Sequence, residues 1–321
     1  MNKYDAIVIG AGHNGLTNAA YLAKAGLKVA VLERNPYIGG ATVSRELHKG
    51  WTYSNCSYVC SLLRPEIARD LELPRHGLQV VPYGGGVTFK RDGGYYGNYY
   101  DHNRQYREMS RHSKRDANAY ERYTADVMKQ TRLIRPFLLK RPPDPTSLKL
   151  RDLRDLAEFA SPFLAMGEEG LADTLKFWTK SVGDYLEEYF ESDVIKAHMA
   201  GSGIIGTALG VYSPGTAYVL LHHYMGDVDG NVGSWGFARG GMGAVAGALA
   251  KSFQAFGGEI ICDADARQIV VRGGKVTGVA LANGDEYQAN VVVSILDPKR
   301  TFLDIMDSAD LPPDVTTAAR N

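Results

Sequence analysis

The stretch Tyr4-Asp-Ala-Ile-Val-Ile-Gly-Ala-Gly-His-Asn-Gly15 decides the fold of the N-terminal region. It opens with a short β-branched apolar run, which predicts a strand buried on both faces. Apolar residues at helical spacing follow and stop at Gly26, where a glycine favours the end of a helix. A second apolar run over residues 27–32 predicts another strand, and an acidic residue follows it directly. The first forty residues therefore predict a complete βαβ unit.

The glycines of this unit have the spacing of a dinucleotide-binding turn. Gly10 suits a tight turn off the strand, Gly12 allows a pyrophosphate to come close, and Gly15 lets the helix pack on the strand. The phosphates are then expected on unpaired amides at the start of the helix, beside Ala11 and Asn14. A glycine turn without a ligand is the alternative. Strand, glycines, helix, second strand and terminal acid all occur in register, which favours a bound nucleotide.

Glu33 stands at the end of the second predicted strand, where a carboxylate can accept hydrogen bonds from both hydroxyls of an adenosine ribose. It would repel a 2′-phosphate, which argues against NADP. A second glycine pair, Gly39-Gly40, follows, with Arg34 before it and Ala41 after it. A plain NAD site does not need this pair, so it indicates a second loop that approaches a larger dinucleotide. An ordinary turn is the alternative.

The composition is that of a globular protein. The 321 residues include 36 Lys and Arg and 36 Asp and Glu, so no global field favours nucleic acid or a membrane. No apolar run reaches the length of a membrane span. The first strand begins within about four residues of the start, which leaves no room for a signal peptide, so a cytoplasmic location is expected. The three cysteines, Cys56, Cys60 and Cys262, argue against a disulfide framework.

The middle of the chain is predicted to be rich in helices. Ser113 followed by Asp116 predicts a capped helix that runs to Ile134. Further helices are expected over residues 147–166, 171–190, 192–200 and 215–225. His222-His223 could include a proton shuttle, but neighbours on a helix point about 100° apart, so at most one faces a given pocket. A structural role for both is favoured.

Residues 101–155 contain 14 Lys and Arg against 8 Asp and Glu. Phe137, Leu138 and Leu139 stand beside Lys140 and Arg141, which together indicate a possible peripheral contact with an anionic membrane surface. A solvated helical face is the favoured alternative.

After residue 235 the chain returns to a βα pattern. Gly240-Gly241-Met242-Gly243 opens a helix that Gly257-Gly258 ends, and strands are predicted over residues 259–262, 266–272, 275–281 and 290–294. The turns Gly273-Gly274 and Asn283-Gly284 predict hairpins. We find no Ser/His/Asp signature and no metal-ligand spacing, so the sequence assigns no catalytic residue and no metal site.

These motifs together resemble the FAD-dependent phytoene desaturase and carotenoid isomerase-like oxidoreductases, within the wider amine-oxidase fold group. More narrowly, the chain is similar to the branch named pyridine nucleotide-disulfide oxidoreductase domain-containing protein 2. The resemblance spans nearly the whole chain, with its motifs in the right order. The residues that carry it are Tyr4 to Gly40, Leu62 to Glu66, Asp70 to Leu73, Ser110 to Asp116, Trp235 to Ala248, Val292 to Ser294 and Asp297-Pro298.

The resemblance implies an α/β fold: a Rossmann-like FAD-binding domain of the GR2 type, formed by residues 1–80 and 236–321, with residues 81–235 inserted as an α+β substrate domain. It implies FAD as the cofactor and a small apolar substrate. The substrate would pass a hydride to flavin N5, with oxygen or a quinone as final acceptor. Beyond the glycines and Glu33, Arg34, Gly39 and Gly40 would lie along the cofactor. Ala266 would contact the adenine through its backbone, and Ser294 would lie near the dinucleotide.

Two features depart from this pattern. A redox dithiol with Cys-x4-Cys spacing is missing after the glycine pair, since Ala41-Thr42-Val43 stands there. The glycine-rich closing segment and final helix of the relatives have no counterpart between Asp297 and Asn321, so the C-terminal closing segment is expected to be missing. Two alternatives to the oxidoreductase therefore stay open: a truncated or non-catalytic nucleotide-binding relative, and an NAD-dependent dehydrogenase.

Overall fold

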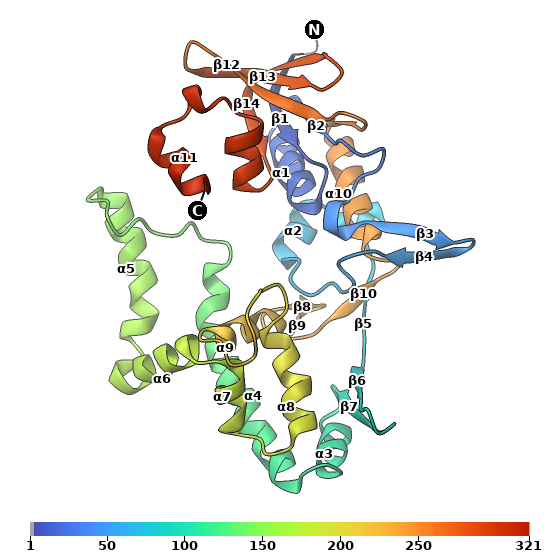
Figure 1. The fold of residues 1–321 in the computed structure, drawn as a ribbon, viewed down its shortest axis with the longest axis vertical. Helices are drawn as coiled ribbons and strands as arrows, with labels where there is room; N and C mark the ends of the chain where they lie inside the picture. Colours follow the sequence, from blue (N-terminus) through green and yellow to red (C-terminus); the bar gives the residue numbers. More distant parts are fainter. Residues whose placement is uncertain (1–2, 321) are drawn as a thin grey trace. The chain divides into compact units, whose positions relative to one another are not determined.

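The computed structural model describes residues 3–320 and divides the chain into two compact units (Figure 1). The first unit contains the residues up to Pro82 and those from Trp235 onward, and the second is Tyr83–Ser234. The first unit has the predicted α/β architecture, which confirms the expected fold class. The second unit is mainly helical and contains two short strand pairs, so its core is built by helices.

A six-stranded sheet forms the centre of the first unit. Its strands are β1 (Lys3–Ile9), β2 (Val29–Leu32), β11 (Glu259–Ile261), β12 (Ala266–Arg272), β13 (Lys275–Leu281) and β14 (Glu286–Ser294), in the order β11-β2-β1-β14-β13-β12. The first four strands of that order run parallel, and β14, β13 and β12 form an antiparallel meander. The chain thus returns after the second unit to place β14 directly beside β1.

Both faces of the parallel part are covered, which explains why its strands are continuously apolar. On one face, α1 (His13–Lys24) packs beside α10 (Gly243–Ala255), as Figure 1 shows, and small residues let both helices lie close to Val8 and Val31. On the other face, Ile7 and Leu32 pack with residues of the meander such as Ile269. The predicted βαβ unit is therefore present, with its second strand two residues shorter than expected.

The remaining elements of the first unit surround this sheet. They are β3 (Ser44–His48), β4 (Trp51–Ser54), α2 (Pro65–Asp70), β5 (Val80–Pro82), β10 (Gly236–Ala238), α11 (Pro313–Arg320), three 3-10 turns (Gly40–Thr42, Leu73–His76, Ser308–Asp310) and a π-helical turn (Arg300–Asp304). The hairpin of β3 and β4 caps α10, because the hydroxyls of Ser54 and Ser44 accept hydrogen bonds from the amides of Met242 and Gly243 at 2.9 and 2.8 Å. This contact explains the small residues at the start of α10.

The second unit contains seven α-helices among the described residues, with short hairpins at its ends. The helices are α3 (His102–Ser110), α4 (Lys114–Ile134), α5 (Leu150–Leu164), α6 (Gly167–Thr179), α7 (Val182–Glu187), α8 (Asp193–Ala200) and α9 (Thr216–Val219). Strands β6 (Gly85–Phe89) and β7 (Tyr95–Tyr99) pair with each other, as do β8 (Asp227–Val228) and β9 (Asn231–Val232). A 3-10 turn at Arg135–Phe137 precedes α5, another at Gly201–Gly203 follows α8, and a third at Leu220–His223 follows α9.

The predicted cap of the long helix α4 is confirmed. The Ser113 hydroxyl accepts a hydrogen bond from the Asp116 amide at 3.1 Å. The Asp116 carboxylate is fully buried, and its two oxygens accept hydrogen bonds from the amides of Glu191 and Ser192, each at 2.9 Å. The motif at 110–116 therefore joins the start of α4 to the start of α8, which gives it a structural role.

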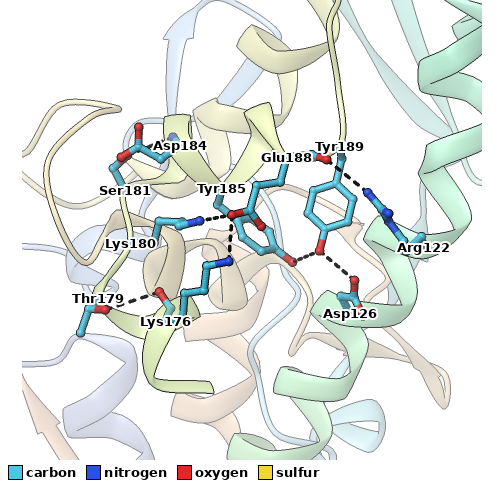
Figure 2. Close-up of polar contacts among 10 residues, drawn as sticks. All are labelled: Arg122, Asp126, Lys176, Thr179, Lys180, Ser181, Asp184, Tyr185, Glu188 and Tyr189. Atoms are coloured by element: carbon cyan, nitrogen blue, oxygen red, sulfur yellow. Dashed lines mark hydrogen bonds and ion pairs between the residues drawn. The ribbon is translucent and has the colours of Figure 1, made fainter. Parts of the chain in front are cut away.

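The single helix expected over residues 171–190 is wrong, because the chain breaks between α6 and α7. The first helix ends at Thr179, and Ser181 caps the second by accepting a hydrogen bond from the Asp184 amide at 3.0 Å. Figure 2 shows how this break is held: Glu188 pairs with Lys176 and Lys180. The Tyr189 hydroxyl next to it donates to Asp126 of α4 at 2.7 Å. A capping serine inside an apolar pattern was the signal for this break.

The partly buried histidine His223 predicts a pH dependence of stability. Burial, with a smaller contribution from His222, lowers its pKa from 6.5 to about 4. Between these two values the unfolded chain binds a proton at this side chain and the folded chain does not, so the free energy of unfolding falls as the pH falls. We expect this group to contribute a slope of up to about 1.4 kcal/mol per pH unit in that window.

Chemical denaturation of the wild type and of His223→Gln between pH 4 and 7 measures this contribution. The variant should lose stability less steeply as the pH falls, while His48→Gln, which changes an exposed histidine outside the ion pairs of the described residues, should match the wild type. Equal slopes for all three proteins would contradict the assignment.

Candidate functional site

Two glycines of the first turn are required by the fold itself. Gly10 has φ of +102°, in the region that favours glycine, and a Cβ there would lie 2.9 Å from the Ile295 side chain. A Cβ on Gly15 would lie only 2.1 Å from the carbonyl oxygen of Gly10. The start of α1 therefore packs directly on the end of β1, as the sequence predicted for a close helix–strand contact.

The third glycine, Gly12, has no such internal reason. Its backbone has φ of −73° and ψ of 169°, which any residue can adopt. A Cβ there would meet its nearest neighbour, the Ile295 side chain, at 3.6 Å, which is ordinary van der Waals contact. The protein alone would accept a side chain at this position. An absent side chain here leaves room for a ligand against the backbone.

Gly12 is also the N-cap of α1, and no side chain caps the helix there. The first amides of a helix have no partner within the helix, and its N-terminus carries a partial positive charge. Open space and available donors thus coincide at the start of α1. This is the arrangement that binds phosphate groups.

The second glycine loop lies against the first. The Gly39 amide donates to the Ala11 carbonyl at 2.9 Å, and Gly12 and Gly39 form an isolated parallel bridge. A Cβ on Gly40 would lie 3.2 Å from the Cα of Gly12. The backbone of Gly39-Gly40 therefore forms one wall beside the first turn, with Gly39 buried and Gly40 exposed.

Glu33 is buried at the end of β2, and its carboxylate ties three segments together. One oxygen accepts a hydrogen bond from the Ala11 amide at 2.9 Å, and the other accepts from the amide and side chain of Asn35 at 3.0 and 2.7 Å. A carboxylate has about four acceptor positions. Three are in use, so this arrangement leaves room for roughly one ribose hydroxyl, and a second one requires the Asn35 side chain to move.

These residues surround a hollow of about 330 Å³, here called the first hollow. It lies over the carboxyl ends of β1 and β2, next to the start of α1, which is where open α/β sheets bind ligands. Among the residues predicted from the sequence, the structure brings six to its wall: Gly10, Gly12, Glu33, Arg34, Gly40 and Ala266. Ala266, at the start of β12, comes from more than 200 positions later in the chain.

The other predicted residues lie elsewhere. Gly15 is buried under the turn, and Ala11 and Gly39 form the backbone contact described above. Ser294 shares a hydrogen bond of 2.7 Å with the hydroxyl of Thr301, so it holds the turn that follows β14. Ala41 is exposed, and its carbonyl accepts a hydrogen bond from the Ser57 amide at 2.9 Å.

Two arginines on the wall of the first hollow were missed by sequence reasoning. Arg267 and Arg300 are exposed and line it with Arg34. No ion pair involves any of these three within residues 3–320, although Asp265 and Asp304 also belong to the wall. Arg267 lies in strand β12 and Arg300 begins the π-helical turn. Neither belongs to a sequence motif, and only the folded sheet brings them to the hollow. Three guanidinium groups beside a helix N-terminus favour an anionic ligand.

A second, larger hollow of about 580 Å³ begins at the next residues of the same helix. Mainly polar residues of α1, such as His13 and Asn14, line it, together with apolar residues from α2, α10 and the segment 57–64, such as Leu63 and Leu249. Burial lowers the pKa of His13 below 6.5. Gly12 and His13 are consecutive, so the turn before α1 separates the two hollows.

The comparisons with known proteins agree with this geometry. Residues 8–68 match the family model of the NAD(P)-binding Rossmann-like domain. The chain is 37% identical to pyridine nucleotide-disulfide oxidoreductase domain-containing protein 2 of Rattus norvegicus, over 97% of this chain and 56% of that protein. The predicted resemblance is confirmed. Prolycopene isomerase of Daucus carota is 26% identical over 97% of this chain and 49% of its own length.

The chain therefore spans about half the length of the curated relatives it matches. Among solved structures, putrescine oxidase bound to putrescine aligns with a TM-score of 0.60 at 17% identity, over 99% of this chain and 63% of that one. The chain thus has the fold of an amine oxidase, as the resemblance implied. All three cysteines are free thiols in the structure, and Cys60 is buried while Cys56 is exposed. No helix within residues 3–320 is both long and apolar enough to cross a bilayer.

The two kinds of glycine predict opposite outcomes on stability. Gly15→Ala places a methyl group against the Gly10 carbonyl, so we expect it to destabilise the protein by about 1–3 kcal/mol. Gly12→Ala meets only ordinary contacts and should stay within about 0.5 kcal/mol of the wild type. Urea denaturation of both variants checks this. A loss at Gly12 as large as that at Gly15 would show that Gly12 is also required by the fold.

Proposed function

We propose that this chain binds FAD in its first unit and acts as an FAD-dependent oxidoreductase on an apolar substrate. The observation that carries the proposal is Gly12, a position where the fold itself does not require a glycine. Gly12 lies at the start of a helix that no side chain caps, on the wall of a hollow that Glu33 also lines. The similar rat protein is named for an oxidoreductase domain, which supports the same function.

The residues of the first hollow suit the ADP half of the cofactor. The amides at the start of α1 and the guanidinium groups of Arg34 and Arg300 would hold the pyrophosphate. Glu33 would accept a hydrogen bond from a ribose hydroxyl with its remaining lone pair, and Ala266 would contact the adenine through its backbone. Glu33 would also repel a 2′-phosphate, which favours FAD or NAD over NADP.

The riboflavin half would then extend past Asn14 toward the second hollow. When bound, FAD supplies a flavin ring that accepts a hydride at N5. The chain contributes a water-poor wall, with Leu63, Met242 and Val245 beside the hollow, and this environment suits an apolar substrate better than a charged one. We propose a carotenoid-like or lipid-like substrate, with oxygen or a quinone as final acceptor.

His13 is the titratable side chain closest in sequence to the turn, and its lowered pKa keeps it neutral at neutral pH. It therefore adds no fixed charge beside the pyrophosphate, and its ring can still donate or accept a hydrogen bond. We assign it a binding role and no catalytic one.

The visible absorption spectrum of the purified 321-residue chain, with and without added FAD, tests this function. We expect bound flavin bands that bleach on reduction. Gly12→Ala, whose fold should be intact, should lower FAD affinity at least tenfold, because the new methyl group fills the space for the phosphates. Glu33→Gln should also weaken binding, by roughly tenfold, because an amide nitrogen replaces an acceptor.

Gly247→Ala is the matched control, since that glycine lies in α10 with no atom within 4 Å of the added Cβ. A chain that stays colourless with added FAD, while a version extended at its C-terminus turns yellow, would favour the alternative of a non-catalytic relative for the present chain. Tight binding of NADH without any flavin would favour a dehydrogenase.

A further inference from the structure

Helix α5 has two apolar faces, and only one of them is used within the second unit. Phe159 and Phe163 pack on Phe137, with ring centroids 4.9 and 6.2 Å apart, and Phe163 also meets Trp178 of α6. The side chains on the other face are spaced by three and four residues, which places them on one stripe. That stripe contains Leu150, Leu153, Ala157, Ala160 and Leu164.

The leucines of this stripe are exposed to a degree that is unusual for the residue type. Leu150 is 84% exposed and Leu164 is 77% exposed, and Leu148, just before the helix, is 88% exposed. Soluble proteins show single exposed leucines, but contiguous apolar patches mark contact surfaces. The sequence Leu148-Lys149-Leu150-Arg151, here called the α5 tip, joins two of these leucines to two cations.

The acidic residues close to the α5 tip in the sequence do not form ion pairs with the cations of the tip. Asp152 is occupied by Arg141 and by the Ser147 hydroxyl, at 2.7 and 2.6 Å, and Asp155 pairs with the same arginine. Glu158 pairs with Arg154 and Lys140. Every carboxylate of α5 therefore has a basic partner.

The two cations of the α5 tip have no acidic partner in an ion pair. Lys149 and Arg151 are exposed and make no ion pair within the described part of the chain, although a side-chain hydrogen bond and, to a smaller extent, the charge of Lys149 lower the pKa of Asp152. The nearest other acidic residue of the preceding loop, Asp144, accepts hydrogen bonds from Thr146. The tip thus presents exposed leucines together with two exposed cations that stand outside every ion pair of the described residues.

We propose that the α5 tip and the exposed stripe of α5 form a docking surface for an anionic lipid bilayer. The leucines enter the interface between headgroups and acyl chains, and Lys149 and Arg151 pair with lipid phosphates. A second copy of the chain fits less well, because one stripe on a 15-residue helix falls short of the roughly 1,200 Å² of a stable interface. The free cations also need an anionic partner, which a second tip does not provide.

This surface differs from the one that the sequence indicated. Phe137 is turned into the aromatic cluster, and Lys140 and Arg141 are engaged by carboxylates of α5. Leu138 and Leu139 remain partly exposed. The proposal does not depend on the cofactor, because it concerns a different unit and a different readout.

Flotation of the purified full chain with vesicles tests the proposal. We expect binding to mixed phosphatidylcholine–phosphatidylglycerol vesicles, weak binding to phosphatidylcholine alone, and a decrease as salt rises. Leu148→Ser with Leu150→Ser should reduce binding to the anionic vesicles at least tenfold. Lys149→Glu with Arg151→Glu should reduce it by roughly tenfold or more.

Two control variants separate this surface from general effects. Leu175→Ser removes an exposed leucine of α6, and Arg107→Glu with Lys114→Glu reverses two exposed charges on α3 and α4. Both should bind vesicles like the wild type, and thermal melts should show that all variants fold. Absence of wild-type flotation, or equal losses in the controls, would overturn the proposal. So would light scattering that shows a dimer lost in the leucine variant while vesicle binding stays unchanged.

Discussion

The first unit depends on one backbone contact, that of Gly15 with the carbonyl oxygen of Gly10. No side chain larger than hydrogen fits between them. This contact fixes the angle at which α1 leaves β1, and so decides where the unpaired amides of the helix point. The same turn rests on Ile295, which follows β14 and lies within 4 Å of the positions where Gly10, Gly12 and Gly15 would have a Cβ. The nucleotide-type turn therefore needs the return of the chain after residue 235, which makes the discontinuous first unit a requirement of the site.

Glu33 shows how one carboxylate can serve the fold and the site together. Its hydrogen bond from Ala11 joins β2 to the glycine turn, and its bonds from Asn35 hold the start of the following loop. The Glu33 backbone also accepts from Ala264, just before β12. An acidic residue at this position is thus explained in part by the protein's own structure. Its presence alone is weaker evidence for a ribose than the pattern of the sequence suggested, and the open space at Gly12 is the stronger evidence.

Much of the fold could be predicted because it follows from local patterns. The βαβ unit, the Ser113 cap and the hairpins after residue 265 all depend on residues close in sequence. The residues that local patterns missed are those whose role depends on distant partners. Arg267 and Arg300 join the first hollow only because β14 lies beside β1. Ala41 and Ser294 were placed by analogy, and the structure gives each a local contact away from the wall of the first hollow.

The charged middle of the chain shows why net charge is a poor guide to a binding surface. Residues 101–155 have an excess of six positive charges, but Lys140 and Arg141, which stand close to Phe137 in the sequence, are paired with carboxylates of α5. A paired charge contributes little field at a distance, because its partner cancels it within a few ångströms. The field at the surface therefore comes mainly from the charged residues that stand outside the ion pairs. Lys149 and Arg151 remain, beside two leucines that no element covers. The sign of the surface is therefore decided by the pairing between the carboxylates of α5 and basic residues of the preceding segment. With Arg141 turned outward, the same composition would place the exposed positive charge at Arg141.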